Sequence, residues 1–101
     1  MRVEFLEPAR AELQEAIAYY DSQRQGLGSE FGAEVKGTIE KILQFPEAWA
    51  SLSKRTRRCR TRRFPYGIIY QVKSDFVLIV AVMHLHREPG TWRDRLPREN
   101  Q

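Results

Sequence analysis

The stretch YGIIYQVKSDFVLIVAVMHL, residues 66–85, determines the fold of this chain. Residues 66–72 are rich in Ile, Tyr and Val, which favour β-strands. Residues 76–85 are apolar almost throughout, as expected of a strand that is covered on both faces and lies in the centre of a sheet. The polar residues 73–75 between them predict a hairpin loop.

The residues around this hairpin predict two more strands. Residues 58–64 alternate in a β-compatible way, and the following Phe64-Pro65-Tyr66 predicts a turn tighter than the first. At the other end of the chain, residues 2–6 alternate and predict a short first strand.

Two helices are predicted between the first and second strands. Pro8 fits the first turn of a helix that Gly26 and Gly28 end. Ser29 is placed to cap a second helix, which Phe45-Pro46 closes. Apolar residues recur at helical spacing in both helices, at Ala9, Leu13, Ile17 and Tyr20 and then at Phe31, Val35, Ile39 and Ile42.

The predicted order of elements is β-α-α-β-β-β. The short link between the helices implies an antiparallel hairpin. The fold class is therefore α+β, with a small, mostly antiparallel sheet and the N-terminal helical hairpin packed on one of its faces. We expect residues 1–101 to form a single domain. Its polar tail, about residues 89–101, forms either a short helix or a partly free segment.

Composition restricts where the chain works and what it binds. Seventeen Lys and Arg against thirteen Asp and Glu give a formal net charge of +4 and a pI of about 9.6. The single cysteine, Cys59, cannot form an internal disulfide, which suggests a reducing compartment. No apolar run reaches the length of a membrane span, so we expect a cytoplasmic protein with no membrane partner.

The positive charge is concentrated in one segment, where seven of the ten residues from Lys54 to Arg63 are basic. At a period of two, Arg58, Arg60 and Arg62 would point to one side, and rows of guanidinium groups match phosphates. A solvated edge strand is the alternative, because charges on edges also prevent aggregation. The density of charge favours binding to a polyanion or an acidic protein, with Arg63 as a further contact.

Other candidate site residues follow the apolar strand. His84 could move a proton near neutral pH, and Arg87 could stabilise phosphate charge. His84 and His86 could also bind a metal, but no third ligand stands at suitable spacing, so we expect neither metal nor cofactor. The alternative for His84 is a hydrogen-bonded, half-buried side chain. Trp92 either anchors the tail on the sheet or contacts a partner, and anchoring is favoured.

The order of these residues resembles the RelE/ParE superfamily of toxins from bacterial type II toxin–antitoxin and plasmid-stabilisation systems. The resemblance extends over roughly residues 3–95. It is carried in the helices by Ala11-Glu12-Leu13, Ala16, Tyr19-Tyr20, Gly28, Phe31, Ile39, Ile42 and Pro46. In the strands and tail it is carried by Arg63-Phe64-Pro65-Tyr66, Ile69-Tyr70, Ala81-Val82, His84, Arg87 and Trp92.

The resemblance implies one of two activities. One branch of the superfamily cuts mRNA on the ribosome without metal, and Arg60 and Arg62 fit the places of its basic strand residues. Gly67, however, stands where that branch commonly has an arginine, and Trp92 stands near its catalytic tyrosine. An indole is no useful proton donor or acceptor at neutral pH. The ParE-like branch, which acts on DNA gyrase and is not known as a nuclease, is therefore favoured.

Two alternatives stay open on sequence alone. A ribosome-dependent mRNA endonuclease would use His84, His86 and Arg87 together with Arg60 and Arg62, and the chain is then an enzyme. A non-catalytic nucleic-acid-binding module would use the basic face and lose affinity steeply as salt rises.

The resemblance also implies a partner, a cognate antitoxin that neutralises the toxin in a hetero-oligomer. One helical hairpin covers one face of the sheet, so we expect the other face to keep basic residues and exposed apolar ones such as Ile68 or Val80. The antitoxin segment would fold on binding and lay acidic and apolar side chains over this face.

Overall fold

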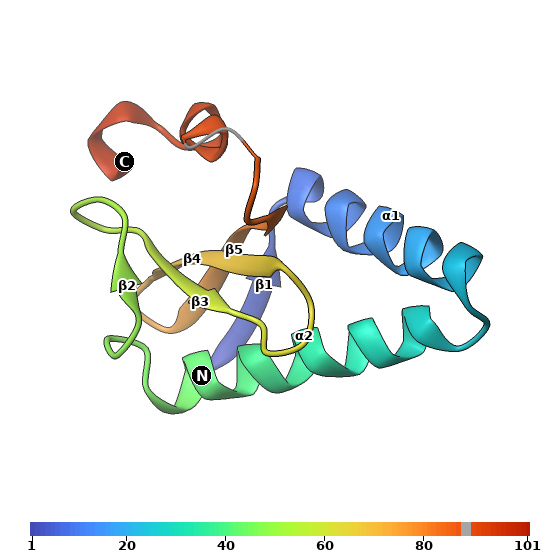
Figure 1. Ribbon diagram of the computed structural model, residues 1–101. Coiled ribbons are helices and arrows are strands. Elements are labelled where there is room, and N and C mark those ends of the chain that lie inside the picture. Colours follow the sequence, from blue (N-terminus) through green and yellow to red (C-terminus); the bar gives the residue numbers. More distant parts are fainter. Residues whose placement is uncertain (88–89) are drawn as a thin grey trace.

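The computed structural model describes residues 1–87 and 90–101, and Pro89, where the predicted tail begins, lies outside them. The predicted α+β class is confirmed, with two helices packed against a five-stranded sheet (Figure 1). The elements are β1 (Arg2–Phe5), α1 (Glu7–Gln23), α2 (Leu27–Gln44), β2 (Ala50–Ser51), β3 (Arg57–Arg60), β4 (Tyr66–Val72) and β5 (Phe76–His84), followed by two short 3₁₀ helices, η1 (Thr91–Arg95) and η2 (Arg98–Asn100).

The strands lie in the order β1-β5-β4-β3-β2. β5 is central, as its apolar sequence predicts, with β1 parallel on one side and β4 antiparallel on the other. β3 and β2 continue the sheet in antiparallel pairs. The two-residue β2 was not predicted, because a strand this short has no alternation to detect.

A register shift in the β4–β5 pair changes which side chains of β5 face the helices. Ile69 pairs with Ala81 while Tyr70 pairs with Ile79, so Val80 is an extra residue in β5. The inserted residue reverses the alternation. Ile79 and Val82 consequently both belong to one core cluster, although they are three residues apart.

The start of α2 differs from the prediction. α2 begins at Leu27, so Ser29 lies inside the helix, and Gly26 precedes it with a left-handed φ of 88°. Gly28 does not end the first helix but packs against it, since a Cβ at this position would lie 2.4 Å from the carbonyl oxygen of Ile17. The backbone N–H of Gly28 donates to Asp21 Oδ1 at 2.7 Å, and α1 thereby caps α2.

One face of the sheet, called here the helix face, carries the larger core. Phe31, Val35 and Ile42 of α2 are buried against it. Tyr20, Phe31, Phe64 and Tyr66 form an aromatic cluster whose ring centroids lie 4.8–6.1 Å apart. The predicted apolar face of the helical hairpin is confirmed, and it fixes which side chains of the strands point inward.

The opposite face, called here the tail face, is covered as well. In Figure 1 the C-terminal segment lies on the side of the sheet opposite α2. Trp92 and Leu96 of this segment pack on Ile69, Val80, Ala81 and Met83 in a second core cluster. The expectation of exposed Ile68 and Val80 is wrong, because both are fully buried, Ile68 under the helices and Val80 under the tail.

β3 is shorter than predicted. It ends at Arg60, and residues 61–65 leave the sheet in a turn rather than continuing the strand to Phe64. Thr61 fixes this turn, because its hydroxyl group donates to the Phe64 carbonyl at 2.6 Å and its backbone N–H donates to the Tyr66 carbonyl at 3.0 Å. The early end of β3 determines where the basic residues go.

Candidate functional site

The basic segment is divided between both faces of the sheet. Arg58 pairs with Ile69 and lies on the tail face, as does Arg60 two residues later. Arg57 pairs with Tyr70, which belongs to the helix-face core. Arg62 follows the strand and lies beside α2. The prediction that Arg58, Arg60 and Arg62 share one side is therefore wrong, because the chain leaves the strand after Arg60.

Arg63 forms its ion pairs with α2 of the same protein. Its guanidinium forms ion pairs with Glu34 at 3.2 Å and Glu30 at 3.3 Å, and its backbone N–H donates to Glu34 at 2.7 Å. Burial would raise the pKa of the Glu34 carboxyl, but hydrogen bonds from Arg63 and from the backbone N–H groups of Arg62 and Phe64 outweigh burial, and the pKa is lowered. Arg63 thus ties the turn after β3 to α2, whatever else it contacts.

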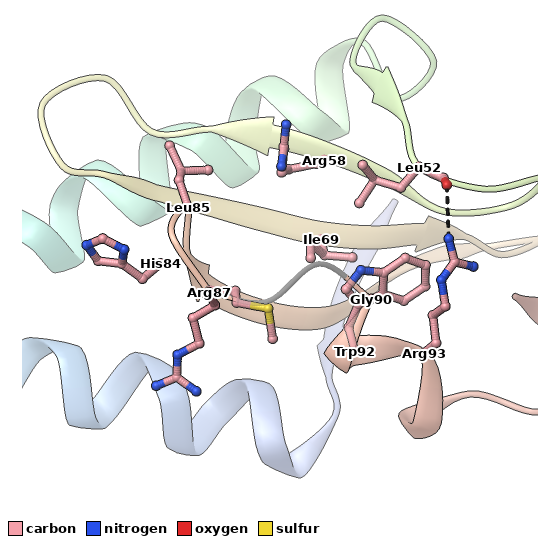
Figure 2. A pocket seen from close by; sticks show the side chains of 10 residues that line it. Leu52, Arg58, Ile69, His84, Leu85, Arg87, Gly90, Trp92 and Arg93 are labelled. Atoms are coloured by element: carbon pink, nitrogen blue, oxygen red, sulfur yellow. Dashed lines mark hydrogen bonds between the residues drawn. The ribbon is translucent and has the colours of Figure 1, made fainter.

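A pocket of about 240 Å³ opens on the tail face (Figure 2). It brings together four of the predicted site residues, Arg58, His84, Arg87 and Trp92. Arg60, Arg62, Arg63 and His86 do not line it. Leu52, Ile69, Met83 and Leu85 form its apolar walls, and Gly90 and Arg93 complete the lining. We call this site the tail-face pocket.

Arg58 crosses the pocket wall in close contact with the backbone of β4. A Cβ at Gly67 would lie 2.8 Å from Arg58 Cδ and 2.9 Å from Arg58 Cγ. Gly67 is therefore the residue that makes room for the arginine. The Nε atom of Arg58 is buried and has no hydrogen-bond partner among the described residues. A buried donor in this state is costly unless a ligand satisfies it.

Trp92 anchors the tail, the favoured of its two predicted roles. The side chain is 3% exposed, and the Arg93 guanidinium carbon lies 4.5 Å from the centroid of its ring. Arg93 also donates to the Leu52 carbonyl at 3.3 Å, as the dashed line in Figure 2 shows. Arg93 and Leu52 were missed from sequence, because neither stands in a pattern that separates it from ordinary tail or loop residues.

His84 and His86 lie at the end of β5 with their ring centroids 5.1 Å apart. The backbone N–H of His86 donates to His84 Nδ1 at 3.1 Å. In the neutral ring the proton is therefore on Nε2, which makes that atom a hydrogen-bond donor. The His84 ring also packs edge-on against Tyr66, with centroids 5.3 Å apart, as expected of a half-buried structural histidine.

A partly buried ion pair that was not predicted holds the tail to α1. Arg95 donates to both carboxylate oxygens of Glu12, at 2.8 and 2.7 Å, and also to the Val80 carbonyl at 3.0 Å. Glu12 in turn accepts from the backbone N–H of Val82 at 3.1 Å. The hydrogen bond to Glu12 raises the pKa of Arg95. The pair lies at the edge of β5 beyond the end of β1. It was not predicted because the two residues are 83 positions apart in the sequence.

Within residues 1–87 and 90–101, no three His, Cys, Asp or Glu side chains gather where they could hold a metal ion. Over the same part of the chain, neither helix is long and apolar enough to cross a membrane. The buried thiol of Cys59 has a pKa raised by burial and is not activated.

Comparisons with known proteins agree with the sequence resemblance. The family described as "ParE toxin of type II toxin-antitoxin system, parDE" matches residues 3–89. A solved structure titled "Chromosomal ParDE TA system from P. aeruginosa" has a similar fold, with a TM-score of 0.72 and 16% sequence identity. The similarity covers 83% of this chain and 95% of the other. A search of curated proteins found no match.

Proposed function

We propose that this chain, which belongs to the ParE toxin family of type II toxin–antitoxin systems, poisons DNA gyrase and is neutralised by a cognate antitoxin. The family match supports the assignment as a toxin of a toxin–antitoxin system. The choice of gyrase over mRNA rests on the chemistry of the tail-face pocket, whose side chains are suited to binding and poorly suited to proton transfer.

Cleavage of mRNA without metal needs a group that removes the proton of the attacking 2′-hydroxyl. Arginines stay protonated at neutral pH and cannot serve as this base. His84 is the titratable side chain among the described lining residues, and its Nδ1 accepts a backbone hydrogen bond while Nε2 carries the proton. The ring would have to give up its contact with His86 before it could act as a base.

Trp92 gives a second reason. Its indole is buried in the tail-face core and covered by the Arg93 guanidinium. It therefore neither donates a proton to a leaving group nor offers a free face on which a nucleobase could stack. A surface of arginines over an apolar floor instead resembles the composition of protein interfaces, which are enriched in Arg, Trp and Met.

The proposal is tested with purified toxin and two parallel reactions. Supercoiled plasmid is incubated with gyrase and ATP, and translating ribosomes are supplied with a defined mRNA. We expect linear DNA that depends on gyrase, and intact mRNA. The variant His84→Ala is assayed in parallel once circular dichroism shows that it folds. Neither the wild type nor this variant should cut the mRNA, because we expect His84 to act in packing and not in proton transfer.

Cuts at fixed codon positions in the mRNA that vanish in folded His84→Ala protein would overturn the proposal in favour of a nuclease. Loss of catalysis through a missing proton-transfer group costs roughly 10²–10⁴-fold, which is far larger than the effect of a small packing defect.

A further inference from the structure

We infer that the tail-face pocket is a carboxylate-binding site that takes an Asp or Glu side chain, next to an apolar residue, from an extended segment of the antitoxin. This inference rests on the proposed neutralisation by an antitoxin and adds the site and the chemistry of recognition. The sequence led us to expect the antitoxin on an exposed apolar face. The tail covers that face, so the inference places the contact in the tail-face pocket instead.

The first argument is charge. Arg58, Arg87 and Arg93 line the pocket, and no carboxylate is among its described lining residues. Figure 2 shows the Arg87 guanidinium pointing away from Arg58, toward α1, and Arg93 is held by Leu52. Arg58 is the guanidinium group left to bind a ligand. Its planar fork matches a carboxylate, and its buried Nε, which has no partner among the described residues, would gain one.

The second argument is the apolar lining. Leu52, Ile69, Met83 and Leu85 surround the arginine, so an ion entering alone would leave these side chains facing water. A peptide that presents an acidic and an apolar side chain together satisfies both parts of the site. The low polarity of the walls also strengthens the attraction between Arg58 and a bound carboxylate.

The third argument separates a peptide from a nucleic acid. Single-stranded nucleic acids bind through bases stacked on exposed aromatic rings. The rings among the described lining residues are those of Trp92 and His84. Trp92 is 3% exposed with Arg93 over it, and the His84 ring packs against Tyr66 and His86. A phosphate could reach Arg58, but the indole offers its nucleobase no free face.

The experiment follows the indole N–H resonances of isotopically labelled toxin. Trp92 reports on the pocket, and Trp49, a partly buried residue that packs against the helix-face core, is the internal control. The probes are a short capped peptide of alternating Glu and Leu, the same peptide with Gln for Glu, and a single-stranded oligonucleotide of similar length. We expect the Glu peptide to shift Trp92 and leave Trp49 in place. The Gln peptide should bind about tenfold more weakly, as loss of one charged hydrogen-bonded pair predicts.

Two arginines of β3 provide a matched pair. Arg58→Gln and Arg60→Gln remove the same charge from the same face of the same strand, but Arg58 lines the pocket and Arg60 does not. Affinity for the Glu peptide should fall about tenfold in the first variant and less than about twofold in the second. Equal losses would mean that net charge alone attracts the peptide, and the inference would be wrong.

A second variant changes the pocket without changing its charge. Gly67→Ala places a methyl group within 2.8 Å of Arg58 Cδ, so the stem of the arginine must move. We expect a loss comparable with that of Arg58→Gln, with the melting temperature reported alongside. Unchanged affinity in a folded Gly67→Ala protein would count against Arg58 as the ligand-binding group. An oligonucleotide that shifts Trp92 more strongly than the Glu peptide would replace the inference with a nucleic-acid site.

The final arm uses a candidate antitoxin, taken from the reading frame that neighbours the gene of this chain. If it binds wild-type and Arg58→Gln toxin equally, and the Glu peptide leaves Trp92 unshifted, the pocket inference fails while neutralisation by an antitoxin stands. If the peptide binds as described and the neighbouring protein does not, the proposed neutralisation fails while the carboxylate site stands. The two failures are thus distinguishable.

Discussion

The two faces of the sheet are closed by different means. On the helix face, two long helices place a continuous aromatic and aliphatic cluster over β3, β4 and β5. On the tail face, a short C-terminal segment supplies Trp92 and Leu96 and is held by hydrogen bonds and one ion pair. The helix face accounts for most of the apolar burial. The tail face combines a smaller core with the arginines and the pocket, so stability and binding are divided between the faces.

The largest expected effect is on the helix face. Phe31 is fully buried and contacts the rings of Tyr20, Phe64 and Tyr66. Phe31→Ala should lower the free energy of unfolding by about 3–5 kcal/mol, from lost burial together with the cavity that remains. Urea unfolding followed by far-UV circular dichroism measures this. In a domain of this size such a loss approaches the whole stability.

A matched comparison is Leu96→Ala, which truncates a buried residue of the tail-face core. We expect a smaller loss of global stability, because the tail can detach while the helix-face core stays folded. A loss as large as that of Phe31→Ala would show that the two faces unfold as one unit and would contradict the division between them.

The second prediction concerns the ion pair that holds the tail. Arg95→Ala removes the bidentate contact with Glu12 and leaves its half-buried carboxylate without this partner. The cost should be on the order of 2 kcal/mol, as expected for hydrogen bonds to charged groups. It should appear as faster hydrogen exchange in residues 91–96 and a red-shifted Trp92 emission, with the helices little changed.

Arg98→Ala is the control for this prediction, since Arg98 is an exposed arginine of the same tail. It should leave exchange and emission unchanged. If Arg95→Ala instead speeds exchange throughout α1 and α2, then the tail is part of the global folding unit and its separate role is wrong.

The sequence predicted the helix face well because that face obeys simple periods. Phe31, Val35 and Ile42 recur at helical spacing, and all three are buried in the core cluster. The apolar run of β5 indicated a central strand, which is confirmed. The prediction that failed on this face concerns only the start of α2. Ser29 is a good capping residue by type, but a side chain of the neighbouring helix, Asp21, caps α2.

The tail face could not be predicted in the same way. Its coverage depends on Trp92 and Leu96 packing on strands that are distant in sequence, and on an Arg95–Glu12 contact across 83 positions. Parity placed Ile68 on the same face as Val80, whereas Ile68 pairs with Val82 and lies on the helix face while Val80 lies on the tail face. The candidate residues Arg58, His84, Arg87 and Trp92 were named from sequence, but their meeting in one pocket depends on these long-range contacts.

The smallest expected effect tests the edge of the helix face through Tyr70. This side chain is fully buried, and its hydroxyl donates to the carbonyl of Pro46, which follows α2. Tyr70→Phe should lower the free energy of unfolding at neutral pH by about 1 kcal/mol, the usual contribution of one hydrogen bond. Urea unfolding at pH 7 measures it, and Tyr19→Phe, at an exposed ring, should have no comparable effect.

The pH dependence gives a sharper form of the same test. Burial raises the pKa of Tyr70 to about 12, whereas a tyrosine in the unfolded chain ionises near 10. Between these values the unfolded chain loses the proton first, so the free energy of unfolding of the wild type falls as pH rises from about 10 to about 12. Phenylalanine has no proton to lose, and the Tyr70→Phe curve should fall less steeply over this range, with Tyr20 and Tyr66 still contributing. The difference between the two proteins should therefore shrink, or change sign, toward pH 12. Parallel curves would mean that Tyr70 ionises as readily in the folded protein as in the unfolded chain, and that its hydroxyl is open to water at the rim of the helix face.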